Sequence, residues 1–310
     1  MPQLTLILAL LTALAVASWF AAPRWWARIL LALARRRAGL VSRIIEIENI
    51  RWHFLEGGRG PTLLLLHGFG GRADNWDRLA PLLGPRFHLV IPDLPGFGES
   101  EPPDRLRFDI ESQAERLSQF LDAVGIDRCL VAGNSMGGYL ATALAAGEPD
   151  RVELLWLLAP LGVRSVEPGE MLRAIDSGDT EYLQISSLRQ FRERFIPMMF
   201  SSNSWFPGPL VKAMADSAMA VRDQAPRMLQ EVRFESEPLE AIAKRVSRPV
   251  LVQWGEDDRV VNPAGGCVLG RVFADAECVQ TQRCGHLPMW ERPRESARCL
   301  FEFLDAHRQP

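Results

Sequence analysis

The chain has 310 residues, a length that suits one large α/β domain or two smaller domains. Apolar residues make up 47% and charged residues 24%, which excludes a disordered or fibrous protein for most of the chain. The net charge of −3 is unevenly distributed: residues 1–45 contain six arginines and no acid, so the rest of the chain carries a net charge of −9. An acidic main part of the chain argues against DNA or RNA as the main partner.

The first predicted element is a membrane anchor. No charged side chain occurs from Pro2 to Pro23, and the apolar run Leu4–Ala22 is long enough for a helix to cross the roughly 30 Å hydrocarbon core of a bilayer. Residues typical of a membrane interface lie at its end: Trp19, Trp25, Trp26, Arg24, Arg28 and Arg35–Arg37. We therefore expect an uncleaved transmembrane helix over residues 1–23 and a basic juxtamembrane linker over residues 24–43.

A cleaved signal peptide is the main alternative for this segment, because Ala15-Val16-Ala17 resembles a cleavage site. A signal peptide carries its positive charge before the apolar run, whereas here the side-chain charges all follow it. A helix lying flat on the membrane does not fit a run so uniformly apolar. The charge asymmetry predicts a single-pass protein of the bacterial inner membrane with a cytoplasmic catalytic domain. A cleaved signal would instead make the protein periplasmic or secreted.

After the linker, short apolar runs alternate with helical patterns, which is typical of a mostly parallel sheet flanked by helices. The continuous apolar run Leu63–Leu66 suits a strand that is buried on both faces. The predicted strands are Ile44–Glu48, Trp52–Leu55, Thr62–Leu66, His88–Ile91, Cys129–Ala132, Leu154–Leu158, Val250–Trp254 and Glu277–Thr281. The predicted helices are Asp109–Val124, Met136–Ala146, Pro263–Val272 and Glu295–His307.

The stretch from Gly162 to Phe234 departs from this alternation. It contains no convincing strand pattern, and it is rich in methionine and aromatic residues. We predict a helical lid over residues 162–234, inserted between a first core part, residues 44–161, and a second, residues 235–310. Some of its apolar side chains are expected to line a pocket, since ligand sites are mostly apolar and methionine adapts to flexible chains.

The predicted strand Cys129–Ala132 runs into Gly133-Asn134-Ser135-Met136-Gly137-Gly138, which precedes a predicted helix. A G-x-S-x-G segment between a strand and a helix places its serine on a sharp, strained turn, where only small residues fit two positions before and after it. The helix N-terminus that follows favours developing negative charge. We predict Ser135 as a catalytic nucleophile. A glycine-rich turn that merely packs a helix on a strand is the structural alternative.

A serine nucleophile needs a base, and the chain offers five histidines. His53 and His88 lie in predicted strands, and His307 lies in the terminal tail. His67 ends a strand and begins the segment His67-Gly68-Phe69-Gly70. His286 lies in a loop between the last predicted strand and the final helix, and it completes the chain order Ser…Asp…His. We therefore predict His286 as the base.

The base must be oriented by a buried carboxylate. Glu256, Asp257 and Asp258 all follow the predicted strand Val250–Trp254, and spacing alone does not choose among them. An oxyanion hole needs two backbone N–H groups, one from the residue after the nucleophile and one from a loop after an earlier strand. Met136 and Phe69 occupy those positions. His67 is then expected to hold the loop in place.

Five segments occur in the order typical of α/β-hydrolases, and from Ile44 to its end the chain resembles that family. They are His67-Gly68-Phe69-Gly70, Asp93-Leu94-Pro95-Gly96-Phe97-Gly98-Glu99-Ser100, Gly133–Gly138, Trp254-Gly255-Glu256-Asp257-Asp258 and Gly285-His286. The resemblance implies the α/β-hydrolase fold and selects Asp258 as the acid, because the family's acid stands three residues after the glycine of W-G-x-x-D. It gives the Asp93–Ser100 segment a structural role near the active-site entrance.

A closer resemblance is to membrane-anchored monoacylglycerol lipases of this class. It rests on the anchor, the basic collar, and Cys284-Gly285-His286 followed by Glu291-Arg292-Pro293-Arg294. It implies a serine ester hydrolase that acts on lipid-derived acyl esters through an acyl-enzyme, with Ser135, Asp258 and His286 as the triad and the Phe69 and Met136 amides as the oxyanion hole. No metal or organic cofactor is implied.

Other functions are compatible with the same residues. Serine at position 135 disfavours the dehalogenases and epoxide hydrolases of related folds, whose nucleophile is an aspartate. It leaves open a C–C bond hydrolase of the meta-cleavage product type and a cofactor-free haloperoxidase. A catalytically silent interaction protein is a further alternative, which the complete Ser135/Asp258/His286 set argues against.

Overall fold

The computed structural model describes residues 2–101, 106–201 and 206–307, and eight strands form one sheet within them. The strands are β1 (Leu40–Ile47), β2 (Ile50–Gly58), β3 (Thr62–Leu66), β4 (His88–Pro92), β5 (Cys129–Asn134), β6 (Val152–Leu158), β7 (Val250–Gly255) and β8 (Ala276–Thr281). Their order across the sheet is β1-β2-β4-β3-β5-β6-β7-β8. β2 is antiparallel to both β1 and β4, and all other neighbours are parallel. The predicted α/β-hydrolase architecture is therefore confirmed.

The start of the sheet differs from the prediction. β1 begins at Leu40, four residues before the expected Ile44, because Leu40 pairs with Gly57 in an antiparallel hairpin with β2. Residues 41–44 of this edge strand are exposed, so no burial pattern marks them as a strand. The other seven strands overlap their predicted ranges.

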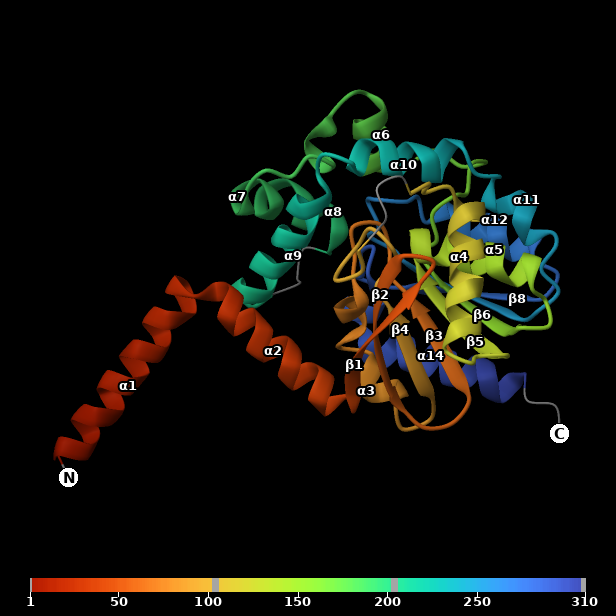
Figure 1. Ribbon diagram of the computed structural model, residues 1–310. Coiled ribbons are helices and arrows are strands. Elements are labelled where there is room, and N and C mark those ends of the chain that lie inside the picture. The colour runs from red at the N-terminus through yellow and green to blue at the C-terminus, as the bar shows by residue number, and fades with distance from the viewer. Residues whose placement is uncertain (1, 102–105, 202–205, 308–310) are drawn as a thin grey trace.

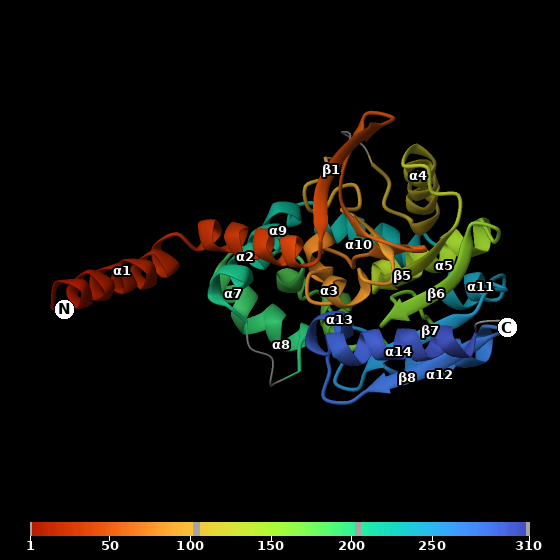
Figure 2. The same cartoon turned by 90° about the horizontal axis from the view of Figure 1, so that it is seen from below.

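Helices cover both faces of the sheet, and the apolar side chains of each central strand point into two separate cores. In β3, Leu63 and Leu65 pack into one core and Leu64 and Leu66 into the other, and all four are 0% exposed. Each fully buried leucine contributes about 1.5–3 kcal/mol. Figure 2 shows α4 and α5 on one face and α14 on the other. The helices around the sheet are α3 (Ala80–Leu83), α4 (Ile110–Ala123), α5 (Met136–Gly147), α11 (Leu239–Ala243), α12 (Ala264–Val272), α13 (Pro288–Glu291) and α14 (Pro293–Ala306).

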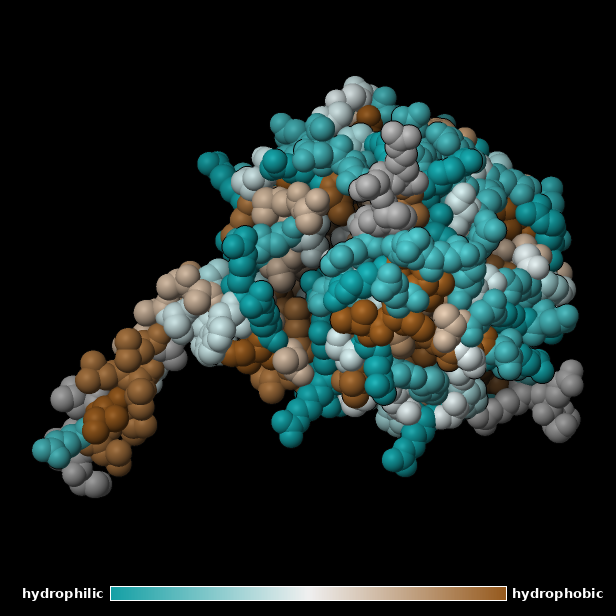
Figure 3. Space-filling view, viewed as in Figure 1, coloured by the Kyte–Doolittle hydropathy of each residue, from teal (hydrophilic) through white to brown (hydrophobic). Residues whose placement is uncertain are grey.

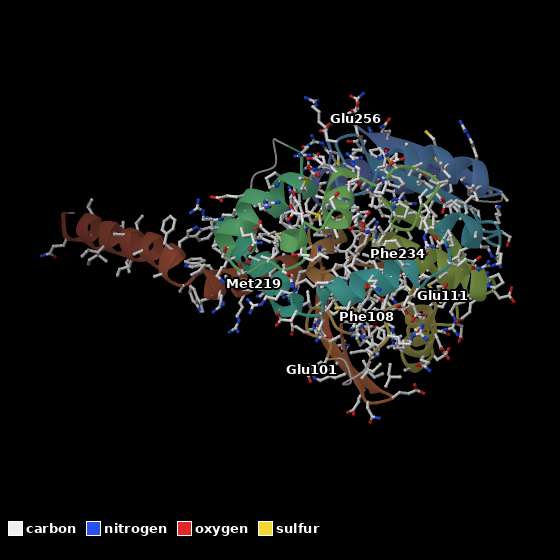
Figure 4. The ribbon with its side chains drawn as sticks, turned by 90° about the horizontal axis from the view of Figure 1, so that it is seen from above. Glu101, Phe108, Glu111, Met219, Phe234 and Glu256 are labelled. Atoms are coloured by element: carbon white, nitrogen blue, oxygen red, sulfur yellow. The ribbon has the colours of Figure 1, made fainter. Side chains whose placement is uncertain are left out.

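The expected helical segment lies between β6 and β7. Within its described residues, 162–201 and 206–234, there are helices and turns and no strand. The helices are α6 (Glu170–Asp176), η2 (Thr180–Tyr182), α7 (Leu188–Gln190), η3 (Phe191–Phe195), α8 (Ile196–Met199), α9 (Gly208–Val221) and α10 (Ala225–Phe234). In Figure 4, which labels Met219 of α9, several of these helices lie on the side of the body from which the N-terminal helix projects.

Two helices precede the sheet. α1 (Pro2–Ala21) projects from the body and is apolar along most of its length (Figures 1 and 3). The segment Gln3–Ala21 has a mean hydropathy of 2.2, and none of the side chains that the structure describes in it is buried. By length and composition this helix can cross a membrane, and a signal sequence meets the same two criteria. α2 (Pro23–Arg37) occupies most of the predicted linker and packs against α9. Pro23, at its first position, sets the bend between the two helices.

Candidate active site

Ser135 lies on a sharp turn between β5 and α5. Its φ of +55° is in the left-handed region, which residues other than glycine rarely adopt. A Cβ on Gly133 would lie 2.2 Å from the carbonyl oxygen of Gly137, and a Cβ on Gly137 would lie 2.3 Å from the carbonyl oxygen of Leu66. The G-x-S-x-G spacing is therefore required by close backbone approach, and it holds Ser135 at the N-terminus of α5.

Asp258 and His286 form a buried pair. The Nδ1 of His286 lies 2.8 Å from the Oδ2 of Asp258, and the two side chains are 3% and 0% exposed. Glu256 and Asp257 are exposed, and Figure 4 shows Glu256 at the outer edge of the body. Of the three acids that spacing left open, the structure brings Asp258 to the histidine.

Both carboxylate oxygens of Asp258 accept further hydrogen bonds. The N–H groups of Val260 and Val261 donate to Oδ1 over 2.8 and 3.1 Å, and the indole N–H of Trp254 donates to Oδ2 over 3.1 Å. Because Oδ2 is an acceptor, Nδ1 of His286 must carry the imidazole proton. The lone pair of Nε2 is then free to act as a base. Trp254 was not predicted as a site residue. Its position at the start of the W-G-x-x-D segment, four residues before Asp258, is the sequence signal that could have identified it.

Asn134, next to the nucleophile, is a second contributor that sequence reasoning missed. Its side-chain amide donates to the carbonyl oxygens of His286 and Leu158 over 3.1 and 3.0 Å. The N–H of His286 itself donates to the carbonyl oxygen of Met199 over 2.9 Å. The loop that carries the histidine is thereby tied both to the turn of the nucleophile and to the helical segment.

The oxyanion loop, defined here as His67–Gly71, contains the predicted segment His67-Gly68-Phe69-Gly70 and packs directly against Ser135: a Cβ on Gly68 would lie 3.1 Å from the serine Cβ. Nδ1 of His67 donates to the carbonyl oxygen of Gly68 over 2.8 Å, and its Nε2 accepts from the N–H of Leu94 over 2.9 Å. Burial lowers the pKa of His67, so its imidazole is neutral and suits the structural role expected of it. The catalytic use of the Phe69 and Met136 amides remains a prediction.

The other three histidines also have structural partners. Nδ1 of His53 lies 2.8 Å from Asp93, Nε2 of His88 lies 3.0 Å from Glu56, and Nδ1 of His307 lies 2.8 Å from the carbonyl oxygen of Phe303. Burial alone would raise the pKa of Asp93, but the hydrogen bonds from His53 and two backbone N–H groups outweigh it and hold the pKa low. The Asp93–Ser100 segment therefore has the structural place that was expected of it.

Ser135 and His286 line one apolar cavity, together with Phe69 of the oxyanion loop. Most of its wall comes from the helical segment: Met171, Leu172, Tyr182, Leu183, Ile185, Phe191, Phe195, Met199, Leu210, Ala213, Met214, Ser217, Ala218, Val221, Ala225 and Leu229. Leu31 of α2 also lines it, which nothing in the sequence indicated. Trp205, one of the aromatic residues of the predicted lid, lies outside the described residues.

Charged groups on the cavity wall are paired with one another. Arg72 lies 2.7 Å from Asp74 and 3.1 Å from Glu99. Behind them, burial and the negative charge of Asp74 raise the pKa of Asp77 to about 7. Among the residues that the structure describes, no cluster of three His, Cys, Asp or Glu side chains is arranged to hold a metal ion.

Comparison with known proteins adds to this geometry. The family model of the alpha/beta hydrolase fold matches residues 61–293. Lipase 1 of Psychrobacter immobilis is 32% identical over 80% of this chain and 79% of its own length. Human monoacylglycerol lipase ABHD6 is 25% identical over 93% of this chain and 89% of its own. A 2-hydroxy-6-oxononadienedioate/2-hydroxy-6-oxononatrienedioate hydrolase of Dechloromonas aromatica is 30% identical over 85% of this chain and 95% of its own length.

A solved structure is similar over nearly the whole chain, the N-terminal helices included. It is the crystal structure of a membrane phospholipase A described as a bacterial virulence factor, with 34% sequence identity and a TM-score of 0.87. The alignment covers 99% of both chains.

Proposed function

The chain belongs to the α/β-hydrolase fold family, and we propose that it is a serine hydrolase of lipid-derived acyl esters. The observation that carries this proposal is the joint position of Ser135, on its strained turn, and His286, oriented by Asp258, on the wall of one apolar cavity. Relatives named as lipases support an activity on esters.

In the proposed mechanism, Nε2 of His286 takes the hydroxyl proton of Ser135 as its Oγ attacks the ester carbonyl. Asp258 holds the imidazole and stabilises the imidazolium that forms. The N–H groups of Phe69 and Met136 donate to the oxyanion. His286 then gives the proton to the leaving alcohol, and water hydrolyses the acyl-enzyme by the same steps.

The cavity favours a long acyl chain as the part of the substrate that binds. Its wall is mostly apolar, and three methionines and three aromatic rings of the helical segment line it, namely Met171, Met199, Met214, Tyr182, Phe191 and Phe195. Arg72, which lies on this wall, is already paired with Asp74 and Glu99 and so offers little to a dicarboxylate. This disfavours the C–C bond hydrolase, whose named relative acts on a dioate. We propose that residues 162–234 act as the lid that receives the chain.

A substrate panel tests this function. We expect hydrolysis of p-nitrophenyl esters with kcat/KM rising from acetyl to medium-chain esters, because each added methylene buried in the cavity contributes about 0.8 kcal/mol. Monoacylglycerols should be hydrolysed faster than triacylglycerols. Phospholipids belong in the panel because of the similarity to a membrane phospholipase A.

Three outcomes would contradict the proposal. Cleavage of a 2-hydroxy-6-oxo-dienoate without ester hydrolysis would establish the C–C bond hydrolase. No hydrolysis at all, together with no labelling of Ser135 by a fluorophosphonate probe, would favour the silent interaction protein. Peroxide-dependent halogenation without ester hydrolysis would identify a haloperoxidase.

We further propose that α1 is an uncleaved anchor and that the body faces the cytoplasm. The apolar length of α1 and the arginines of α2 that follow it support this placement. At the bend, the rings of Trp25 and Trp26 lie 5.1 Å apart, and the indole N–H of Trp26 donates to the hydroxyl of Ser18 over 3.1 Å. Such a tryptophan cluster suits the interface between lipid and water.

Removal of residues 1–22 should yield a soluble protein that still hydrolyses short, water-soluble esters. Its activity on long-chain esters in vesicles should fall more, because the anchor raises the local substrate concentration without touching the triad. The cut is placed before Pro23 because a deletion of residues 1–40 would also remove α2 and its cavity residue Leu31. Both activities are measured on the two forms at matched concentration.

Membrane topology is measured on the full chain. The protein should resist alkaline carbonate extraction, and its body should be cut only by protease added to the cytoplasmic side. A mature protein that begins near residue 18 and lies in the periplasm would show that the segment is a cleaved signal.

A further inference from the structure

One face of the juxtamembrane helix α2 is fixed to the body at both ends. Arg24 donates to Asp216 of α9 over 2.8 and 3.2 Å, and Arg35 donates to Asp74 through two bonds of 2.7 Å. Between them, Ala27 is 3% exposed and Leu31 lines the cavity. The spacing of three to four residues places all four on one side of the helix. The helix is therefore part of the wall around the active site.

The Arg35–Asp74 contact is the more specific of the two. It is a bidentate pair between a planar guanidinium and a carboxylate, with side chains 20% and 5% exposed. Such partly buried, forked pairs hold a fixed geometry and are screened little by salt. The Arg24–Asp216 pair is open to water, since the Arg24 side chain is 72% exposed, and it contributes less.

Asp74 lies in η1 (Ala73–Trp76), which is separated from the oxyanion loop His67–Gly71 by Arg72 alone. The loop itself is fixed to the core through His67, whose Nε2 accepts from the N–H of Leu94. The η1 helix that follows it is fixed on two sides: the N–H of Ala73 donates to Asp93, and Asp74 accepts from Arg35. The loop is thus held between the core and the juxtamembrane helix, and the Phe69 amide lies within it.

We propose that Arg35 is a positioning residue for the oxyanion hole and acts through Asp74 on the His67–Gly71 loop. This inference rests on the proposed function. Arg35 holds Asp74, which lines the cavity together with Gly70 and Gly71 of the loop. We therefore expect its effect to fall on the oxyanion and on the transition state more than on the acyl chain, which the helical segment is proposed to receive. The juxtamembrane helix thereby contributes to the chemical step in addition to linking the body to the anchor.

Removal of this contact should lower kcat and leave KM little changed. Without Arg35, Asp74 keeps only Arg72, and the loop can shift outward from Ser135. A misplacement of about 1 Å in a catalytic group can cost roughly 10²-fold in rate. We expect Arg35→Gln to lower kcat on a short p-nitrophenyl ester about tenfold or more, with KM changed less than about twofold. Arg35→Lys keeps the positive charge but loses the bidentate geometry of the guanidinium, so its kcat should lie between those of the wild type and Arg35→Gln.

The experiment measures kcat and KM of the full-length protein in detergent. The Arg35 variants are compared with Asp74→Asn and with the Arg35→Gln/Asp74→Asn double variant, and Arg36→Gln is the matched control. Arg36 is the exposed neighbour on the same helix, so its variant removes the same charge without the contact and should keep the wild-type kcat. If Arg35 acts through Asp74, the double variant loses no more than the worse single variant. The affinity for an alkylboronic acid, which mimics the tetrahedral intermediate, should fall in parallel with kcat/KM.

Several results would overturn the inference. They are an unchanged kcat in folded Arg35→Gln, an equal loss in Arg36→Gln, or additive losses in the double variant. If Arg35→Gln does not fold, kcat is measured on Arg35→Lys and Asp74→Asn instead. A wild-type kcat in both variants refutes the positioning role of Arg35. The proposed function fails separately, since it requires that Ser135→Ala lose the hydrolysis that the wild-type chain shows. An active wild type, an inactive Ser135→Ala and an unaffected Arg35→Gln would refute the positioning role alone.

Discussion

Replacement of Ser135 by alanine should lower the rate of ester hydrolysis by roughly 10³-fold or more and leave the fold intact. The change removes the attacking oxygen, and water must then attack the ester with help only from binding and the oxyanion hole. The side chain is small and the backbone strain at φ +55° belongs to the turn itself, so alanine should fit the same conformation. Initial rates on a medium-chain p-nitrophenyl ester and the melting temperature are measured on the same preparation.

Ser217→Ala is the matched control for this variant. Ser217 lines the same cavity from α9, and its hydroxyl donates to the carbonyl oxygen of Ala213. Loss of that hydroxyl should leave the rate close to that of the wild type. Near-full activity of a folded Ser135→Ala variant would end the serine-hydrolase proposal.

The sheet could be predicted from the sequence because its strands are short apolar runs with clear ends. Leu63–Leu66 is buried on both faces, and its continuous apolar pattern is what such burial requires. The start of β1 could not be predicted in the same way, since residues 41–44 are exposed and are held by pairing with β2. Cross-strand pairing is not visible in the periodicity of one segment.

The turn around Ser135 could also be predicted, because the strain of the turn demands glycine at fixed positions. The choice among Glu256, Asp257 and Asp258 needed the family resemblance, since three adjacent acids all follow β7. The structure shows what spacing cannot. Asp258 is buried where two backbone N–H groups and Trp254 donate to its carboxylate, and its two neighbours face solvent.

The packing of α2 against the body could not be predicted from the sequence. The arginines of residues 24–37 indicate a membrane interface by their charge alone, and this reading accounts for them without any contact to the body. Arg35 differs from Arg36 only because helical geometry turns it towards Asp74, thirty-nine residues further along the chain. A long-range ion pair between a linker and a catalytic loop leaves no local pattern.

Asp258→Asn should lower kcat by roughly 10³–10⁴-fold, while Asp257→Asn should remain close to the wild type. In the wild type, Oδ2 of Asp258 accepts from both Trp254 and His286, and Oδ1 accepts from two backbone N–H groups. An asparagine must turn its NH₂ towards one of these sets of donors. If the NH₂ faces His286, the imidazole presents its Nδ1 lone pair there and carries its proton on Nε2, so it cannot accept the proton of Ser135.

Asp257 is the matched control because it is the exposed neighbour in the same turn, and its backbone N–H, which donates to the carbonyl oxygen of Cys284, survives the substitution. kcat and the melting temperature are measured for both variants, since loss of the buried carboxylate also lowers stability. A kcat loss in Asp258→Asn that persists well below its melting temperature separates catalysis from folding. Equal small effects of both substitutions would mean that another group orients His286, and the reverse ranking would move the role to Asp257.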